Sequence, residues 1–426
     1  MIQNNKAHID LRLSLCFWLI GCLLITFLSI SYSVARNSYF FLLLMYIYPL
    51  GMAFTIYLVS KLVRHRTAKK IFIYGLFFSI SFTSYFGITK IMDGSYASSS
   101  NLLLFGLSFY SVSLAFTFFR KNYLTLTDVL FSSNPILIFT GPILVTIRSI
   151  KYRELKKRIK YFLPFIIFGL FLVEVISTTI TPTFFMANNV DLISSLGFAI
   201  IFELFIYANF CGLSLMIYGF SGIIGYQIPL NFKQPFSSRN VMEFWRGWHI
   251  SLSNVLKEFF YIPIRKKSNI YVAIFFVFLS SALWHGVSLT FILWGMLHFF
   301  SFGITIFLIK RNFPYLNTLI LVIAIILGRL IFLESDLTVL LEKLQFKYSG
   351  FGFFDDLQAL PKQTVLGLSL IMIIVLAEFF FKKNAYFRNR NYKFYRLLIP
   401  QIMLSIFIVL SISESSGFLY PVYGQR

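Results

Sequence analysis

The chain has 426 residues and a net charge of +22, with 58% hydrophobic and only 13% charged residues. Soluble domains contain about 25% charged residues, so this composition excludes a soluble globular fold. Long apolar stretches recur along the whole length, which predicts a single integral membrane domain over residues 1–426, of the all-α polytopic class.

Apolar stretches of bilayer-spanning length predict about eleven transmembrane helices. The first four are expected at residues 11–34, 39–60, 71–89 and 101–119. The others are expected at residues 161–181, 191–222, 271–283, 287–309, 317–333, 365–381 and 397–412. The stretch 191–222 is too long for one straight crossing, so we expect it to be tilted or broken.

The apolar stretch 130–148 differs from the others because Pro135, Gly141 and Pro142 interrupt it. Basic residues flank it at both ends, which favours a re-entrant segment with both ends on one side of the membrane. Such a backbone is tolerated at membrane depth only where protein or water covers it. A single kinked spanning helix remains the alternative.

Lys and Arg gather in short links between the apolar stretches, chiefly at 61–70, 148–160 and 382–396. This is the pattern of cytoplasmic loops, where such residues also meet anionic lipid headgroups. The positive charge is thereby explained without a nucleic-acid partner.

Ionisable residues inside apolar stretches are candidates for function, because burying them in hydrocarbon is costly. The candidates are Glu174, Glu203, His285, His298, Arg329 and Glu378, with His249 close by in sequence. The five histidines and three cysteines show no spacing typical of metal ligands, so no metal site is predicted.

The stretch 243–264, EFWRGWHISLSNVLKEFFYIPI, is predicted to form a helix on the cytoplasmic membrane surface that ends near Pro263. Its apolar face consists of Phe244, Trp248, Leu252, Val255 and Phe259. Trp245 and Trp248 are typical of interfacial anchors. An interfacial tether without chemistry is the alternative to a functional role.

His285 lies between Trp284 and Gly286, at the junction of two apolar stretches. A neutral imidazole at membrane depth is suited to act as a general base, because its pKa is near neutrality and burial lowers it further. A structural histidine in the protein core is the alternative.

These residues carry a resemblance to the membrane-bound O-acyltransferases. The motifs are Phe244 to Ser253 (FWRGWHISLS), Tyr261-Ile262-Pro263 and Leu283-Trp284-His285-Gly286. Phe105 to Phe109, Asn134-Pro135, Gly141-Pro142-Ile143, Tyr207 to Gly219 and Pro229 to Phe232 resemble further segments of the family. The likeness covers residues 90–300 and is strongest to the bacterial branch with the alginate O-acetylation protein and the D-alanyl-lipoteichoic-acid transferase.

The resemblance implies a ring of helices around a central tunnel, with His285 as catalytic base and His249 as a second catalytic residue that positions a substrate. Further candidates for the tunnel are Trp245, Arg246, Trp248, Ser251, Trp284, Asn209, Glu203 and His298. The chain departs from the branch at Asn209, where an aspartate is usual, at Gly247, where a second basic residue is usual, and in its shorter interval between the two histidines.

The implied function is acyl transfer, most simply of acetyl, from a cytoplasmic thioester to hydroxyls of an exported cell-envelope polysaccharide or glycolipid. The donor is a co-substrate, acetyl-CoA or an acyl-carrier protein, and no bound cofactor is expected. D-alanyl transfer to a teichoic-acid-type polymer and a non-enzymatic transporter or flippase are the alternatives. The expected location is the bacterial cytoplasmic membrane, with an extracytoplasmic partner protein as a further expectation.

Overall fold

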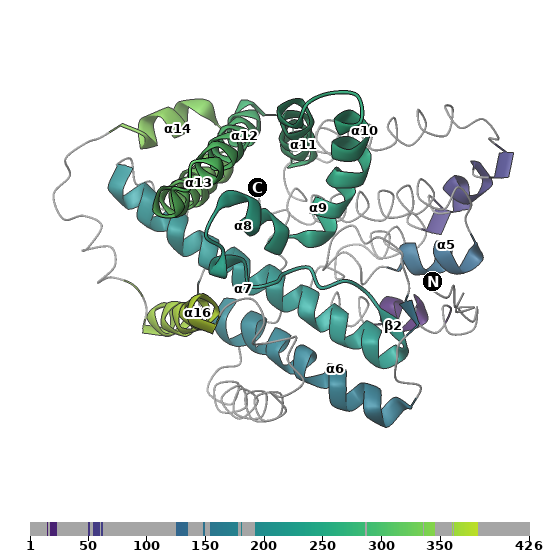
Figure 1. The fold of residues 1–426 in the computed structure, drawn as a ribbon. Helices are drawn as coiled ribbons and strands as arrows, with labels where there is room; N and C mark the ends of the chain where they lie inside the picture. The colour runs from purple at the N-terminus through teal and green to yellow at the C-terminus, as the bar shows by residue number, and fades with distance from the viewer. Residues whose placement is uncertain are drawn as a thin grey trace. The chain divides into compact units, whose positions relative to one another are not determined.

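The structure is a computed structural model of the chain. It describes residues 125–134, 148–149, 154–177, 180, 192–285, 288–334, 336–345, 360 and 362–381, with short pieces at 15, 18–23, 50–51, 54–59 and 61–62. The described residues are mainly helical (Figure 1). The chain divides into two compact units. The first comprises Met1–Leu170, Leu213–Leu230 and Met403–Arg426, and the second comprises Phe171–Gly212 and Asn231–Ile402.

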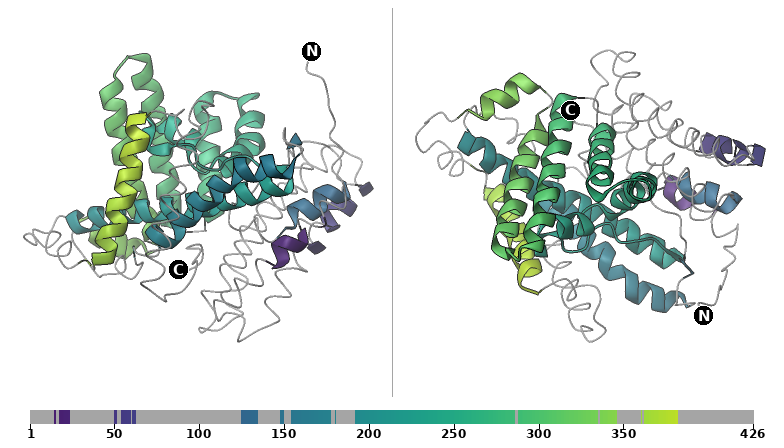
Figure 2. Two further views of the ribbon diagram at one scale, coloured as in Figure 1. Left: turned by 90° about the horizontal axis from the view of Figure 1, so that it is seen from below. Right: turned by 45° about the horizontal axis from the view of Figure 1, so that its top comes forward.

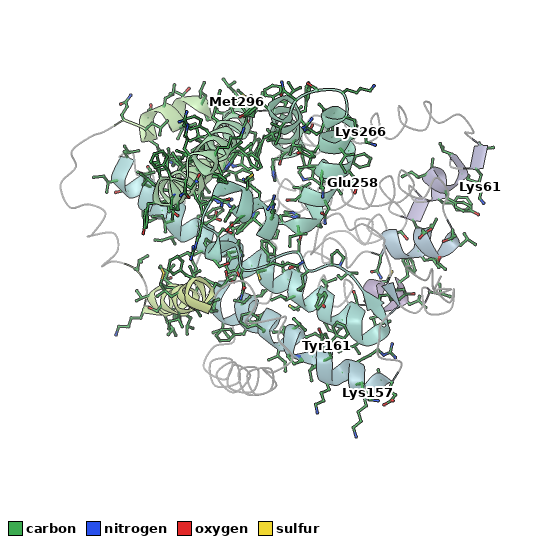
Figure 3. All side chains as sticks on the ribbon, in the orientation of Figure 1. Lys61, Lys157, Tyr161, Glu258, Lys266 and Met296 are labelled. Carbon is green, nitrogen blue, oxygen red and sulfur yellow. The ribbon has the colours of Figure 1, made fainter. Side chains whose placement is uncertain are left out.

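In the first unit, α6 (Leu155–Leu170) packs against the C-terminal part of α7 (Leu192–Ile224). The rings of Phe162 and Phe165 lie 5.5 and 5.0 Å from that of Tyr218. Arg158 Nη1 donates a hydrogen bond of 2.8 Å to the Ile224 carbonyl. Lys157, near the start of α6, is exposed (Figure 3).

Two shorter features belong to the same unit. The helix α5 (Leu126–Ser132) ends just before Pro135, since the residue preceding a proline disfavours helical geometry. The two-residue strands β1 (Arg148–Ser149) and β2 (Tyr226–Gln227) pair in antiparallel fashion. Residues 135–147 lie outside the described part, so the re-entrant segment stays a prediction.

The second unit contains the N-terminal part of α7 and a succession of helices. These are η3 (Phe171–Ser177), η5 (Pro235–Ser237), α8 (Val241–Gly247), α9 (Ile250–Leu256), η6 (Lys257–Tyr261), α10 (Ile262–Arg265), α11 (Ile270–His285), α12 (Leu289–Lys310), α13 (Pro314–Leu333), α14 (Leu337–Lys343) and α16 (Lys362–Phe381).

The helices α11, α12 and α13 form the packed centre of this unit. The helix α12 packs against both α11 and α13, and the short helix α8 packs against α12 and α13 (Figure 1). The left view of Figure 2 shows α12, α13 and α16 running nearly parallel. The helix α16 packs against η3 and η5. Side chains fill the space around α11, α12 and α13, where Met296 marks α12 (Figure 3).

Five helical stretches of the described part are long and apolar enough to cross a membrane. They are Leu155–Ser177, Leu192–Ile224, Leu289–Lys310, Pro314–Leu333 and Lys362–Phe379. The prediction of an all-α polytopic membrane protein is therefore confirmed. The stretch predicted at 271–283 forms α11, whose 16 residues are fewer than the about 20 that span a bilayer. The spans predicted at 71–89, 101–119 and 397–412 lie outside the described residues, and those at 11–34 and 39–60 lie mostly outside them.

The helix α7 is one continuous helix of 33 residues, so the predicted stretch 191–222 is not broken. Its length of about 50 Å exceeds the about 30 Å of the hydrocarbon core. A long helix of this kind can fit the bilayer by tilting, and the tilt expected for this stretch stays a prediction.

The prediction of one helix over 243–264 is wrong. The helix α8 ends at Gly247, Trp248 is extended, and His249 has the left-handed backbone conformation (φ 42°) before α9 begins. The last segment, α10, ends at Arg265, two residues after Pro263 and thus close to the predicted end. The π-helical turn η6 precedes it, and this wider turn accommodates a residue that has no N–H to donate.

The predicted apolar face of this stretch is nevertheless buried. The exposed fractions of Phe244, Trp248, Leu252, Val255 and Phe259 range from 0% to 7%. Trp248 therefore packs inside the protein, and the prediction that it is an interfacial anchor is wrong.

Candidate active site

His285 is the last residue of α11, and aromatic rings surround it. Its ring lies 4.9 Å from that of Phe332, 5.5 Å from that of Trp294 and 6.2 Å from that of Phe291. Trp294 and Phe291 belong to α12 and Phe332 to α13, so three helices meet at this histidine. The residue is half-buried.

Trp294 also contacts the second histidine of α12. Its ring lies 4.8 Å from that of His298, and Trp245 of α8 lies 5.0 Å from His298 on another side. Phe278 of α11 stacks on the same imidazole at 5.9 Å. His298 is buried, with 4% of its surface exposed. The structure thus brings together His285, His298 and Trp245, three of the predicted site residues, around Trp294.

Gly328 of α13 allows this close packing. A Cβ atom at this position would lie 2.7 Å from Nε2 of His298 and 3.6 Å from Nε1 of Trp294. Any larger residue would therefore displace the imidazole. The glycine brings the α13 backbone against the ring nitrogens.

An ion pair lies next to Phe332. The Arg329 guanidinium is paired with the Glu203 carboxylate, through Nε and Nη2 to Oε2. The same guanidinium lies 5.3 Å from the Phe332 ring. Among the described residues, Oε1 of Glu203 has no hydrogen-bond partner. Glu203 is thus connected to His285 by a series of contacts: it pairs with Arg329, which contacts Phe332, which contacts His285.

His249 lies in a tight turn between α8 and α9 that the link after α7 holds in place. The N–H of Ile250 bonds to the Asn231 carbonyl at 2.8 Å, and the N–H of Ser251 bonds to the Asn231 side-chain oxygen at 3.0 Å. The N–H of Lys233 bonds to the Gly247 carbonyl at 2.9 Å. These three bonds fix the turn on both sides of His249.

Gly247 is required at this point for steric reasons. A Cβ atom on it would lie 2.8 Å from the Lys233 carbonyl oxygen and 3.3 Å from Cα of Pro235. The departure from the usual basic residue thus has a local physical explanation in this chain. The link and the end of α8 approach too closely for a side chain.

The imidazole of His249 is buried, and its Nδ1 lies 3.3 Å from Oγ of Ser251. Burial lowers the pKa of His249 from 6.5 to about 4, because a low-dielectric environment disfavours the charged form. The ring is therefore neutral at physiological pH. A neutral imidazole can accept a proton or a hydrogen bond from a substrate hydroxyl.

A continuous series of aromatic contacts joins the two predicted catalytic histidines. It runs from His249 through Phe232, Trp248, Phe244, Trp245 and Trp294 to His285, with ring centroids 5.1 to 6.4 Å apart at each step. Both histidines thus belong to one aromatic core of the second unit.

Tyr207 of α7 packs against the part of this aromatic core that lies next to His249. Its ring lies 4.9 Å from Phe236, 5.9 Å from Phe232 and 6.0 Å from Trp248. Its hydroxyl donates a hydrogen bond to Oε1 of Glu378 on α16. The helix α16 is thereby connected to the residues that flank His249.

The remaining predicted residues occupy different surroundings. Trp284 is buried next to His285 in sequence. Asn209 of α7 is buried and donates a hydrogen bond of 3.0 Å to Oγ of Ser177. Arg246 is exposed. Its role in a tunnel stays a prediction.

Sequence reasoning missed Asn231, Trp294 and Phe332 as parts of the site. Asn231 lies in the family-like segment Pro229 to Phe232, and an asparagine in a tight link often bonds to nearby backbone. Trp294 and Phe332 lie in long apolar helices, where an aromatic residue is typical of ordinary core. Within the described ranges, no group of three or more His, Cys, Asp and Glu residues could hold a metal ion.

The fold and these contacts define a helical, multi-pass membrane protein with buried histidines in an aromatic core. The family model described as MBOAT, membrane-bound O-acyltransferase family, matches residues 2–314. The chain belongs to this family, as the resemblance of its motifs predicted. The match includes His249, His285 and His298, whereas Arg329, Phe332 and Glu378 lie beyond it.

Curated proteins similar to this chain come from several bacteria. The peptidoglycan O-acetyltransferase of Helicobacter pylori is 40% identical over 97 residues, 22% of this chain and 18% of the relative. The probable alginate O-acetylase AlgI of Pseudomonas syringae pv. tomato is 30% identical over 198 residues, 44% of this chain and 38% of the relative. The teichoic acid D-alanyltransferase of Bacillus subtilis is 32% identical over 110 residues, 23% of this chain and 27% of the relative. In each case the matched segment spans less than two fifths of the relative's length.

Proposed function

We propose that the protein is a membrane O-acyltransferase of the bacterial cytoplasmic membrane. It moves an acyl group, most simply acetyl, from a cytoplasmic thioester to a hydroxyl of an exported cell-envelope polysaccharide or glycolipid. The donor is acetyl-CoA or an acyl-carrier protein that acts as co-substrate. The acceptor reaches the site from the other face of the membrane, with or without an extracytoplasmic partner protein.

The observation that carries this proposal is the placement of His285. It is a half-buried imidazole at the end of α11, enclosed by rings from α12 and α13 and connected through aromatic contacts to the neutral His249. An imidazole with partial access and apolar walls is suited to remove a proton from a hydroxyl while water is excluded.

The chemistry needs few protein groups, because a thioester is already activated. The acceptor hydroxyl loses its proton to His285 as its oxygen forms a bond to the thioester carbonyl carbon. The tetrahedral intermediate then expels the thiolate, which takes up the proton from His285, and the products are an ester and a free thiol. Holding the two reactants in line lowers the barrier further.

His249 serves in this scheme as a positioning group for a substrate. Its turn is fixed by Asn231, and its Nδ1 is close to Ser251. The other ring nitrogen, Nε2, then meets the substrate. Since burial keeps this ring neutral, it contributes a hydrogen bond rather than a charge.

Two relatives support acetyl as the first choice of acyl group, since they are named as O-acetyltransferase and O-acetylase. D-alanyl transfer from a carrier protein to a teichoic-acid-type polymer is the second candidate, supported by the relative named teichoic acid D-alanyltransferase. A transporter or flippase of envelope intermediates is the non-enzymatic alternative, in which the buried ionisable residues line a pathway.

The experiment that tests the proposal measures ester-linked acyl groups in the cell-envelope polysaccharide fraction by mass spectrometry. Cells with the wild-type protein are compared with cells that carry His285→Ala and with a deletion, at equal expression of the two proteins. We expect the ester to disappear equally in the variant and the deletion. The mass of the lost group then distinguishes acetyl from D-alanyl.

A different pattern contradicts the proposal. If His285→Ala retains the ester while the deletion loses it, the assignment of the base fails and transport becomes the better account. Loss of polymer export together with the ester in the variant also favours transport. Tyr315→Phe is a suitable control variant, because this side chain is 90% exposed.

A further inference from the structure

Two buried nitrogen atoms next to the His285 site have no hydrogen-bond partner among the described residues. They are Nε1 of Trp245 and Nδ1 of His298. The two rings lie 5.0 Å apart and are nearly perpendicular, at 89°. Buried polar atoms are almost always hydrogen-bonded in native proteins, and leaving one without a partner costs stability. Two such atoms on adjoining rings indicate that a bound ligand supplies their missing hydrogen-bond partner.

Both rings contact the tryptophan that also packs on His285. Trp294 lies 5.9 Å from Trp245, 4.8 Å from His298 and 5.5 Å from His285. The two rings that carry these nitrogens are thus one aromatic ring away from the proposed base. Their position fits residues that belong to the reacting centre.

The rings that pack around the pair are apolar, which restricts the kind of ligand, and the Arg329 guanidinium also acts electrostatically on His298. Phe278 stacks on His298, and Trp245 packs on the core cluster of Ala282, Phe291 and Trp294. An indole N–H can only donate a hydrogen bond, so the ligand must offer an acceptor. A small neutral acyl group with one carbonyl oxygen meets both requirements.

We infer that Trp245 Nε1 and His298 Nδ1 bind the carbonyl oxygen of the thioester donor and stabilise the oxyanion that forms on it. This inference rests on the proposed function and assigns the one catalytic task that His285 and His249 leave open. His298 donates from Nδ1 in the tautomer that carries its proton there.

In the reaction, the acceptor oxygen bonds to the carbonyl carbon and the electron pair of the C=O bond moves onto the carbonyl oxygen. The two N–H groups hydrogen-bond to this negative oxygen. When the C=O bond re-forms, the carbon–sulfur bond breaks and the thiolate leaves. Neither nitrogen gives up its proton, so the balance of the transfer is unchanged. Donors placed where charge develops are among the strongest contributions to catalysis.

Trp245→Phe tests this role because it removes the N–H and keeps an aromatic ring. With the full chain in lipid nanodiscs, and acetyl-CoA or a D-alanyl-carrier protein as the donor, we expect kcat to fall about 10²-fold with little change in KM. Trp18→Phe is the matched control. Its indole N–H donates to the Ser133 carbonyl at 3.2 Å in the first unit, so its loss should leave kcat within about twofold.

A second measurement does not depend on turnover. Infrared spectroscopy with a methyl-ketone analogue of acetyl-CoA, labelled with ¹³C at the carbonyl, reports hydrogen bonding to that oxygen directly. We expect the carbonyl band to shift to lower wavenumber on binding to the wild type, and Trp245→Phe or His298→Phe to reverse part of the shift.

The outcomes separate this inference from the proposed function. Wild-type acyl transfer with an unchanged kcat in Trp245→Phe overturns the inference and leaves the proposed function intact. Absence of transfer from either donor contradicts the proposed function. In that case a ketone band that shows no shift, or a shift that both variants retain, overturns the inference as well.

Discussion

The Arg329 guanidinium of α13 and the Glu203 carboxylate of α7 form a buried ion pair, and the ring of Phe332 contacts both Arg329 and His285. The two side chains are 13% and 6% exposed. Removal of one member of such a pair leaves an uncompensated charge in a low-dielectric environment, which is far more costly than the loss of both.

We therefore expect Arg329→Met and Glu203→Gln each to lower the free energy of unfolding, with the arginine variant losing about 3–5 kcal/mol. The double variant should lose less than the sum of the two single losses. Chemical denaturation in detergent, arranged as a double-mutant cycle, measures the coupling. Purely additive losses would show that the two charges do not stabilise one another.

The hydrogen bond from Tyr207 to Glu378 joins α7 to α16. Tyr207→Phe leaves the carboxylate oxygen without its donor, so we expect a loss of stability of about 1–3 kcal/mol. Because the Tyr207 ring also packs on Trp248, we expect kcat to fall as the turn at His249 loosens. Thermal unfolding and steady-state kinetics check the two effects, with Tyr315→Phe as control. Equal stability of the two variants would contradict the role given to this bond.

The turn at His249 depends on the absence of a side chain at position 247. In Gly247→Ala the new Cβ would lie 2.8 Å from the Lys233 carbonyl oxygen, so we expect a loss of about 1–3 kcal/mol in the free energy of unfolding. Gly303→Ala is the matched control, since its nearest contact would be 3.9 Å. If both variants unfold at the same denaturant concentration, the close approach of the link to α8 is not essential.

Proton uptake by His249 predicts how stability changes with pH. The pKa of this residue is lowered from 6.5 to about 4 in the folded state, so the unfolded chain binds the proton first as the pH falls. The contribution is fully present above pH 6.5 and is lost as the pH falls towards 4. The total change from this group is about 3 kcal/mol.

Thermal unfolding of the wild type and of His249→Gln between pH 4 and pH 7 tests this effect. We expect the wild type to lose stability relative to the variant as the medium becomes more acidic. Parallel curves for the two proteins would show that His249 is not buried in its neutral form.

The sequence alone predicted the helical membrane fold and the long described helices, because long apolar stretches report burial in lipid directly, whereas the short helices α5 and α14 were not predicted. It also pointed to His249 and His285 through local motifs. The break at Gly247 and Trp248 could not be predicted, since it depends on the backbone of Lys233 and Pro235, which pack against α8 only in the folded chain.

Contacts between helices that are distant in the sequence could not be predicted either. Glu203 and Arg329 were both recognised as buried ionisable residues, but periodicity does not show which residue of α7 faces which residue of α13. Trp294 and Gly328 look like ordinary members of apolar helices in the sequence. Only the packing of α12 on α13 shows that they shape the surroundings of His298.

The central claim is that His285 is the base of an acyl transfer. The most direct test is transfer of a labelled acyl group by the purified full chain in lipid nanodiscs, from acetyl-CoA and, separately, from a D-alanyl-carrier protein to a glycan fragment with free hydroxyls. We predict that the wild type forms the ester with one of these donors. His285→Ala should be slower by about 10²–10⁴-fold while its thermal midpoint stays near that of the wild type. Ester formation by His285→Ala at the wild-type rate would contradict the account.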